Sequence, residues 1–452
     1  ISTTMSSPPT AELPLPPGDM GLPFLGKTLD FVLDTENYIR TTAEKYKGGI
    51  SRTSLLFEDT VFMPGAKGFR FATTSGLFES DWPPAFKKLL GDSILLVDGD
   101  LHKKKRQCLS AAFTTEALES YMPTIVNAAE RSWASVQSRV EANPGSALVM
   151  IDELKDMFLD VSWSILIGEN EDLQALLSAD FKKINAALFA PPTKLWPSFR
   201  AGMEARDNII REGTGLVQQR RQELAAGTVS AKRRDVISLL IGARTEEGEL
   251  MGDAEIANEL IMLIFAAFDT SATTATNFLT EVVQRPELMA KLLAEQARVE
   301  NEGGTMAEQV EEMSEMEAVL KEVLRFRPPA AGVFRRCVKD TEFQGYRIPA
   351  GQRVSAGIWL SNRQKTITPK GDGESFCPMR YMDKAAVNSL TFGMGEHQCI
   401  GGRLAFKMLK TYLATFLRKF NVTLEAGQDL KYIFVPTHTP KSGLRLLLTP
   451  KK

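Results

Sequence analysis

Apolar residues recur at helical intervals through the middle of the chain. From Gly99 to about Phe326 they fall three and four positions apart, as they do on one face of an α-helix. The pattern is interrupted at places rich in proline or glycine: Pro144-Gly145, Pro191-Pro192, Gly227, Gly248 and Gly303-Gly304. The sequence therefore predicts a run of amphipathic helices, of which the most apolar is expected over residues 256–284.

The N-terminal region has a different pattern. A proline-punctuated segment runs from Leu15 to Gly26, and a helix is expected from about Asp30 to Tyr46. Ser51–Phe57 and Thr60–Met63 then alternate between apolar and polar residues. This alternation predicts a β-hairpin that turns at Glu58-Asp59.

After Arg327 the helical spacing gives way to short strands and turns. It returns from Ile400 to Phe420, and strands are expected near Tyr432–Val435 and Leu444–Leu448. Together these patterns predict a mainly α protein with a smaller β-rich lobe.

Composition sets the frame for this fold. A chain of 452 residues, 43% of them hydrophobic, can bury a large core, and no linker divides residues 15–452, which we expect to form a single domain. Residues 1–14 are rich in Ser, Thr and Pro and are expected to be disordered or processed. The net charge of -2 and the pI near 6.2 argue against a nucleic-acid partner.

The four cysteines, at positions 108, 337, 377 and 399, fit neither a disulfide framework nor a zinc pattern, which favours a reducing compartment. No apolar run approaches the roughly 20 residues that span a bilayer, and the longest is Leu260–Phe268. The chain starts at Ile1, so removal of an upstream anchor or targeting segment stays open. Cytoplasmic and membrane-associated locations are both compatible with the sequence.

One cysteine stands in a glycine-rich loop just before a predicted helix. Gly393 and Gly395 allow a tight turn around Cys399, and the positive end of the helix beginning near Arg403 would stabilise a thiolate. Cys399 is therefore the candidate metal ligand. The alternative is a buried free cysteine beside a glycine turn.

The loop resembles the haem-ligand loop of the cytochrome P450 family. Five fixed positions match over ten residues: Phe392, Gly395, His397, Cys399 and Gly401. The resemblance implies that Cys399 binds the iron of haem b, with Phe392 and Gly393 beside the cofactor. It extends from Leu15 to about Leu448 and implies the fold of that family.

A second constellation lies in the predicted long helix, where Asp269 and Thr270 interrupt an apolar face. A buried acid and hydroxyl need hydrogen-bond partners, and the pair resembles the acid and alcohol with which the family delivers protons to dioxygen. Alternatively, the Thr270 hydroxyl donates to the carbonyl four residues earlier. Ala267 stands where the family most often has glycine.

A third match joins two segments. Glu322 and Arg325 resemble the family's Glu-x-x-Arg element, and Arg380 stands in a segment that resembles its Phe-x-Pro-x-Arg-Phe element. The resemblance implies a buried network that supports the cysteine loop. The alternative for Glu322 and Arg325 is a solvated surface bridge on one helix face.

Haem propionates need cations or strong donors when they are buried. His102 and Arg106 lie four residues apart on a predicted helix and can reach one point. The resemblance implies that they bind propionate together with Arg335 and His397, with Arg336 as the competitor of Arg335. The three lysines between His102 and Arg106 are expected to form a solvated face.

The reaction that the resemblance implies is insertion of one oxygen atom from dioxygen into a small lipophilic substrate. Electrons would come from NAD(P)H through a separate reductase or ferredoxin, docked where Arg403, Lys407 and Lys410 stand. A monomer with peripheral membrane contact is expected. Desaturation, isomerisation or peroxide-driven chemistry on the same fold remain open, as does a non-enzymatic haem sensor or carrier.

The substrate pocket is expected to be apolar. The candidates that line it are Phe265, Ala266, Ala331, Val333 and Thr437. A faint resemblance of Gly332-Val333-Phe334-Arg335 to the retinoid, sterol and terpenoid hydroxylase branch favours a terpenoid, retinoid, sterol or fatty-acid-like substrate. His438, next to Thr437, is expected to face solvent.

Overall fold

The computed structural model describes residues 13–228, 234–368, 372–382, 387–434 and 437–451. The expectations for residues 1–12 and for Val435 lie outside these ranges. The chain forms two compact units. Unit 1 comprises residues 1–81, 322–398 and 432–439, and unit 2 comprises residues 82–321, 399–431 and 440–452.

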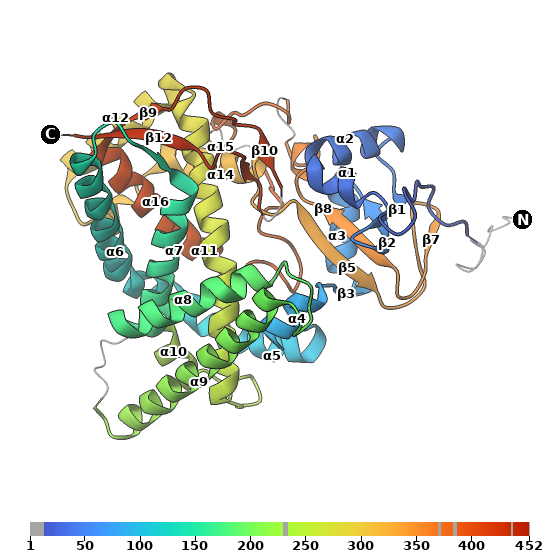
Figure 1. Cartoon of the computed structure of the whole chain (residues 1–452), viewed down its shortest axis with the longest axis horizontal. Coiled ribbons are helices and arrows are strands. Elements are labelled where there is room, and N and C mark those ends of the chain that lie inside the picture. The colour runs from blue at the N-terminus through green and yellow to red at the C-terminus, as the bar shows by residue number, and fades with distance from the viewer. Residues whose placement is uncertain (1–12, 229–233, 369–371, 383–386, 435–436, 452) are drawn as a thin grey trace, which may run out of the picture. The chain divides into compact units, whose positions relative to one another are not determined.

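Unit 1 contains the larger sheet (Figure 1), with strand order β1-β2-β8-β5-β3. These strands are β1 (Ser51–Leu55), β2 (Glu58–Met63), β8 (Arg353–Gly357), β5 (Gly332–Cys337) and β3 (Phe78–Ser80). Its other elements are α1 (Thr28–Leu33), α2 (Thr35–Lys45), α3 (Gly65–Thr74), α15 (Met379–Met382), β6 (Thr341–Phe343), β7 (Tyr346–Ile348) and β10 (Tyr432–Ile433). Val61, Phe69 and Val354 belong to its buried core.

The first hairpin turns two residues earlier than the alternation predicts. Leu55 pairs with Glu58, so Leu56 and Phe57 form the turn, both with positive φ (53° and 66°). This backbone matches the twist of a two-residue hairpin, for which Asn and Gly are the usual residues. Asp59 instead belongs to β2, where it binds Arg52 on the opposite strand. The prediction of a turn at Glu58-Asp59 was wrong because two apolar residues occupy it.

Unit 2 is mainly helical, and the connections between its helices contain the proline and glycine residues at which the sequence predicts interruptions. Its helices are α4 (Pro84–Leu90), α5 (Gly99–Ser110), α6 (Thr115–Ala142), α7 (Met150–Ile167), α8 (Glu171–Ala187), α9 (Pro197–Ala225), α10 (Val236–Gly242), α11 (Asp253–Val283), α12 (Pro286–Glu302), α13 (Met306–Gln309) and α16 (Gly402–Lys419). Helix α14 (Ser314–Phe326) begins in unit 2 and ends in unit 1. The expected fold class, mainly α with small sheets, is confirmed.

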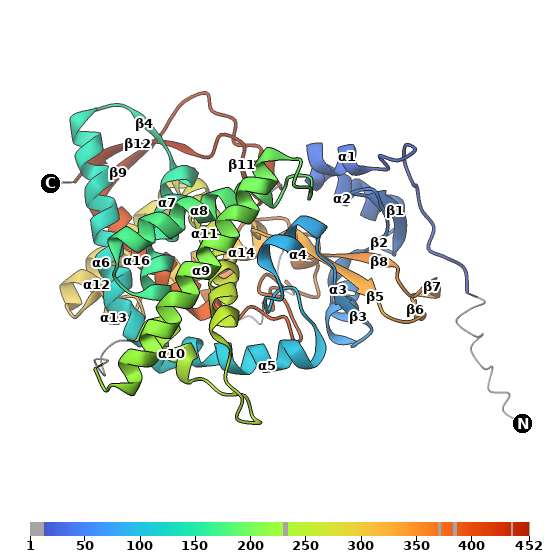
Figure 2. The ribbon, with the colours of Figure 1, turned by 60° about the horizontal axis from the view of Figure 1, so that its bottom comes forward.

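Helix α11 is the central element of unit 2. It packs against α7, α9, α12 and α16, and Figures 1 and 2 show α9 crossing it. Within the described part of the chain it is the one helix long and apolar enough to cross a membrane, and 72% of its most apolar window is buried in the protein. A core helix meets the same criteria.

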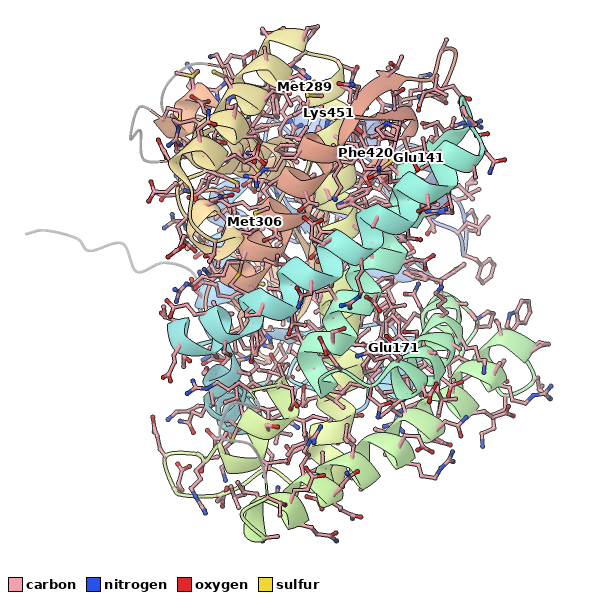
Figure 3. The ribbon with its side chains drawn as sticks, turned by 90° about the vertical axis from the view of Figure 1, so that its left-hand side faces the viewer. Glu141, Glu171, Met289, Met306, Phe420 and Lys451 are labelled. Carbon is pink, nitrogen blue, oxygen red and sulfur yellow. The ribbon has the colours of Figure 1, made fainter. Side chains whose placement is uncertain are left out.

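Figure 3 views unit 2 from the side on which α6 crosses α16, near Phe420. Trp133 of α6 donates its indole N–H to the carbonyl of Tyr412 in α16 (2.9 Å). A three-stranded sheet lies next to them, in the order β4 (Ala147–Val149), β12 (Arg445–Pro450) and β9 (Phe420–Leu424). A short strand, β11 (Thr439–Pro440), precedes β12. This packing holds α16, whose N-terminus follows Cys399.

Candidate functional site

Cys399 precedes α16 with its sulfur facing backbone donors. The N–H groups of Gly401 and Gly402 hydrogen-bond to the sulfur. Desolvation raises the pKa of the thiol, while these N–H groups and the charge of Arg106 act to lower it. Cys399 is exposed, whereas Cys108 and Cys337 are buried and Cys377 is half-buried. Among the four cysteines, Cys399 is therefore the one whose sulfur is most available to a ligand.

The glycines before Cys399 have the backbone that the sequence predicts. Gly393 and Gly395 have φ values of 75° and 71°, in the left-handed region. A Cβ atom at Gly395 would lie 2.4 Å from the carbonyl oxygen of Thr73 in α3. Any side chain at this position would therefore force the loop away from α3, within unit 1.

Helix α5 places a cation next to the cysteine in unit 2. Desolvation lowers the pKa of Arg106, and the nearby thiolate charge of Cys399 raises it. His102, one turn earlier, is buried. Arg106 is thus close enough to Cys399 for their charges to interact, and His102 lies on the same helix as Arg106.

Lys105 contradicts the expectation that all three lysines are solvated. It is 4% exposed and binds Glu259 of α11 (3.1 Å) and Glu255 (2.5 Å). Glu259 is fully buried and also accepts the backbone N–H of Ile94 (3.1 Å). Lys103 and Lys104 are exposed, as expected. The partners of Lys105, buried Glu259 and half-buried Glu255, lie far along the chain, so helical spacing did not reveal them.

Ser80 on strand β3 neighbours both His397 and Arg335 in unit 1. Ser80 of β3 is the register partner of Arg335 on β5, and its hydroxyl lies 3.3 Å from Nε2 of His397. Arg335 is buried. The neighbouring Arg336 is directed to Asp81 (2.8 Å) and Glu58 (3.0 Å). Those two carboxylates already neutralise Arg336, which favours Arg335 as the propionate candidate.

Glu322 and Arg325 form a buried, bidentate ion pair in unit 1. Both side chains are 0% exposed, and their two contacts measure 2.8 and 2.7 Å. The Cys377 N–H donates to Glu322 (2.7 Å), and Arg380 lies 3.5 Å from the same carboxylate. Arg325 also donates to the carbonyl of Gly373 (2.7 Å). Burial excludes the solvated bridge that helical spacing left open.

The same network reaches the segment before the cysteine loop. Arg325 donates to the backbone carbonyl of Asn362 (3.1 Å), and the Asn362 side chain binds the N–H of Leu390 (2.8 Å) and the hydroxyl of Thr391 (3.0 Å). Thr391 donates in turn to the carbonyl of Leu324 (2.7 Å). Phe392 follows directly, so the network fixes the start of the loop.

In α11 the acid and the hydroxyl have separate partners. The Asp269 carboxylate binds Lys155 of α7 (2.8 Å). The Thr270 hydroxyl donates to the Ala266 carbonyl (2.8 Å), which is the backbone hydrogen bond considered from the sequence. The Thr270 oxygen keeps lone pairs that can accept a further hydrogen bond. Lys155 was missed in the sequence, where nothing links it to residue 269.

One turn of α11 is accessible although the helix is otherwise largely buried. Ala266 is exposed and Phe265, Ala267 and Thr270 are half-buried. Phe265 packs edge-on against Phe86 (ring centroids 5.7 Å apart), which stacks on Trp82 (5.3 Å) and meets Phe189 edge-on (5.8 Å). An aromatic cluster thus stands next to the accessible turn and Thr270.

The remaining pocket candidates lie in unit 1. Ala331 and Val333 are half-buried at the start of β5, and Thr437 is buried. His438 is 0% exposed and stacks on Phe434 (3.8 Å between ring centroids). The expectation that His438 faces solvent was wrong, because the rings of Tyr432 and Phe434 pack against it.

The expected docking residues on α16 are largely neutralised within unit 2. Lys410 is buried and binds Glu317 (2.7 Å), so it cannot contribute to a docking surface. Lys407 pairs with Glu311. Arg403 is exposed and donates to the Thr115 hydroxyl (3.1 Å). Of the three, Arg403 alone remains well placed for a partner.

Known proteins with similar sequences cover nearly all of the chain. The Cytochrome P450 family model matches residues 16–449. The chain is 28% identical over 450 residues to a putative cytochrome P450 120 of Synechocystis sp., covering 97% of both chains. It is 31% identical over 445 residues to cytochrome P450 26A1 of Danio rerio, covering 93% of this chain and 87% of the relative.

Solved structures agree with the sequence comparisons. Retinoic acid bound cyanobacterial CYP120A1 superposes with a TM-score of 0.83 at 27% identity, covering 97% of this chain and all of that one. The cytochrome P450DA haem domain matches with the same TM-score at 18% identity, which shows the fold alone. With the family model spanning both units and the cysteine loop, the chain belongs to the cytochrome P450 family, whose members are haem-containing monooxygenases that take electrons from a separate redox partner.

Proposed function

We propose that this monooxygenase hydroxylates or epoxidises a retinoid-like substrate, with Cys399 as the iron ligand. The observation that carries the substrate class is the aromatic cluster of Trp82, Phe86, Phe189 and Phe265 beside the accessible turn of α11. A long polyene or isoprenoid chain matches such a wall by apolar and aromatic contact. The retinoic acid complex of a 27% identical relative supports the same class.

The residues present fit a haem. Cys399 offers an accessible sulfur with two N–H donors, as a thiolate ligand requires. Arg106 is a desolvated cation beside that sulfur, which favours a bound anion such as a propionate. His102, Arg335 and His397 are the further propionate candidates, with Phe392 and Gly393 beside the cofactor. Glu322, Arg325 and Arg380 would hold the loop in place.

Haem with a thiolate ligand supplies the cleavage of the O–O bond of dioxygen and the transfer of one oxygen atom to carbon. The protein has to deliver protons. Thr270 would hold a water at its hydroxyl oxygen, because its hydrogen is donated to Ala266. Asp269 would supply the proton to that water and recover it from the solvent side, where Lys155 is 31% exposed.

The test is a titration of the haem-loaded protein with all-trans-retinoic acid. A low-to-high-spin Soret shift and, with a redox partner and NADPH, a product heavier by one oxygen atom are expected. Palmitic acid serves as the lipophilic control. A larger Soret shift with palmitic acid than with retinoic acid, or the absence of an oxygenated retinoid, would overturn the proposal of a retinoid-like substrate.

The ligand assignment has its own test. Cys399→Ser should abolish the thiolate-type spectrum of the reduced carbon monoxide complex, while Cys108→Ser, Cys337→Ser and Cys377→Ser should each retain it. Loss of that spectrum in one of those three variants, with Cys399→Ser unaffected, would overturn the assignment.

A further inference from the structure

One cation of α9 is poorly neutralised by the protein. The Arg206 side chain is 22% exposed, and within the described part of the chain the one carboxylate inside 4 Å is that of Asp207, at 3.6 Å and 71% exposed. Arg206 also donates to Oδ1 of Asn258 in α11 (3.1 Å), which carries no charge. Its Nε is buried and has no hydrogen-bond partner among the described residues. A guanidinium with these partners retains donors and charge for an anion.

Arg221, further along the same helix, shows how the fold neutralises an arginine of similar exposure. It is 28% exposed, and its Nε binds the carboxylate of Asp253 (2.7 Å). Its two terminal nitrogens donate to the carbonyls of Ile241 (3.2 Å) and Met251 (3.0 Å). Every nitrogen of the Arg221 guanidinium therefore has a protein partner, whereas that of Arg206 does not.

Arg206 stands where α4, α9 and α11 meet. Asn258, which accepts from Arg206, donates from Nδ2 to the carbonyl of Leu90 at the end of α4 (2.9 Å). Gly91 follows with φ of 56°, and a Cβ atom there would lie 3.0 Å from a terminal nitrogen of Arg206. Because residue 91 has no side chain, this side of the guanidinium is left uncovered.

Two of these helices also carry the aromatic cluster of the proposed pocket. Phe86 belongs to α4 and Phe265 to α11, and their rings are in edge-on contact. At about 1.5 Å of rise per residue, Asn258 lies about 10 Å from Phe265 and about 18 Å from Thr270 along the axis of α11. An extended retinoid acid has a comparable length. A carboxylate at Arg206 and a hydrocarbon chain along the cluster would therefore place the opposite end of the molecule near Thr270.

The other cations of α4 are less suited to this role. Lys87 and Lys88 are exposed, so water competes for any anion that they bind. Lys88 also donates to the carbonyl of Pro192 (2.9 Å). The half-buried Arg206 offers a stronger interaction, because a hydrogen bond to a charged group gains strength where water is excluded.

We propose that Arg206 is a specificity-determining residue that binds the carboxylate of an acidic lipid substrate and thereby selects acids over the corresponding alcohols. Nε and the terminal nitrogen beside Gly91 are the donors. Asn258 holds the guanidinium in place through its hydrogen bond and ties it to the end of α4. This inference rests on the proposed retinoid oxidation and specifies which end of the substrate stays away from Thr270.

The test compares two ligands that share a hydrocarbon chain and differ in charge. All-trans-retinoic acid and all-trans-retinol are titrated into the haem-loaded protein, and the Soret shift gives each Kd. Arg206→Gln should weaken binding of the acid by about 10- to 100-fold, the range for a hydrogen bond to a charged group, and change that of retinol by less than about 3-fold. Arg206→Lys keeps the charge and should recover part of the loss.

A matched control lies on the same helix. Arg211 is 67% exposed, and Arg211→Gln removes the same charge without removing a half-buried donor. It should change the Kd of retinoic acid by less than about 2-fold. With a redox partner and NADPH, Arg206→Gln should also distribute the added oxygen over more positions of the retinoid, because the chain is no longer fixed at its acid end.

Equal weakening of acid and alcohol in Arg206→Gln would overturn the proposal, since the residue would then only support the fold, and so would an unchanged Kd for the acid. Palmitic acid and 1-hexadecanol, titrated in the same way, separate this question from the proposed function. Loss of selectivity for palmitic acid in Arg206→Gln, in a protein that binds neither retinoid, would overturn the retinoid class and leave the carboxylate site standing. The carbon monoxide spectrum of each variant reports that the haem site is intact.

Discussion

At the scale of single residues, substitution of Thr270 tests whether its hydroxyl helps to deliver protons or only donates to the Ala266 carbonyl. Thr270→Ala should retain the carbon monoxide spectrum and substrate binding but release reduced oxygen as peroxide. The loss in product per NADPH should be within the range of about 10²–10⁴-fold for a positioned acid. Thr270→Ser keeps the hydroxyl and should retain coupling. Full coupling in the alanine variant would leave the backbone hydrogen bond to Ala266 as the role of this residue.

His438 makes the stability of the fold depend on pH. Burial and the charges of Arg327 and Arg363 hold the pKa of its ring well below 6.5. The unfolded chain takes up a proton on this ring as pH falls below about 6.5, whereas the folded chain does not. The free energy of unfolding should therefore fall by about 1.4 kcal/mol per pH unit from this residue as pH drops below about 6.5, and be unaffected above it.

Urea denaturation of His438→Phe at several pH values checks this dependence. The variant keeps an aromatic ring against Phe434 and should lose the acid-side slope. Phe434→Leu is the control, since it should lower stability by the same amount across the range. An unchanged slope in His438→Phe would assign the acid sensitivity to other groups.

At the scale of the element, two helical Arg–Glu pairs with similar spacing should differ strongly. Glu322→Ala leaves Arg325 buried and unpaired, at a cost of about 3–5 kcal/mol in the free energy of unfolding. Glu302→Ala removes the partner of Arg298, where both side chains are about half exposed, and should cost about 0–1 kcal/mol. Denaturation with haem loading checks both, and similar losses would contradict the role of burial.

Adjacent lysines on α5 provide the same comparison within one helix. Lys105→Met strands the buried carboxylate of Glu259 and should cost about 3–5 kcal/mol, whereas Lys104→Met should cost about 0–1 kcal/mol. Replacing both members, Lys105→Met/Glu259→Leu, should recover much of the loss because no buried charge is left unpaired. Thermal unfolding measures all three, and a double variant no better than the single one would contradict this account.

Much of the helical organisation could be predicted because apolar spacing and helix breakers act locally. The breaks before α7, α9 and α11 fall at Pro144-Gly145, Pro191-Pro192 and Gly248. The turn at Leu56-Phe57 could not be predicted, since its residues are not those that its backbone favours. The partners of Lys105 and Asp269 could not be predicted either, because Glu259 and Lys155 are more than a hundred residues away.

At the scale of the whole molecule, a net charge of -2 conceals local separation of charge. In unit 2, Lys103, Lys104 and Arg403 are exposed cations, and the acids Glu246 and Glu249 lie 3.7 Å from Lys103 and 2.8 Å from Lys104. Composition argues against nucleic acid as a partner, but it could not indicate where a protein partner binds. That information comes from which charges the fold leaves accessible.

The accessibility of Cys399 also has a consequence for the chemistry of the protein before it acquires its cofactor. Without a metal, an exposed thiol is open to alkylation and oxidation, while Cys108 and Cys337 are shielded by burial. The raised pKa of this thiol makes it a slow nucleophile at neutral pH and a faster one as pH rises. Maleimide labelling at mildly alkaline pH should thus modify Cys399 first, and peptide mapping by mass spectrometry would read cofactor occupancy as protection of this single sulfur.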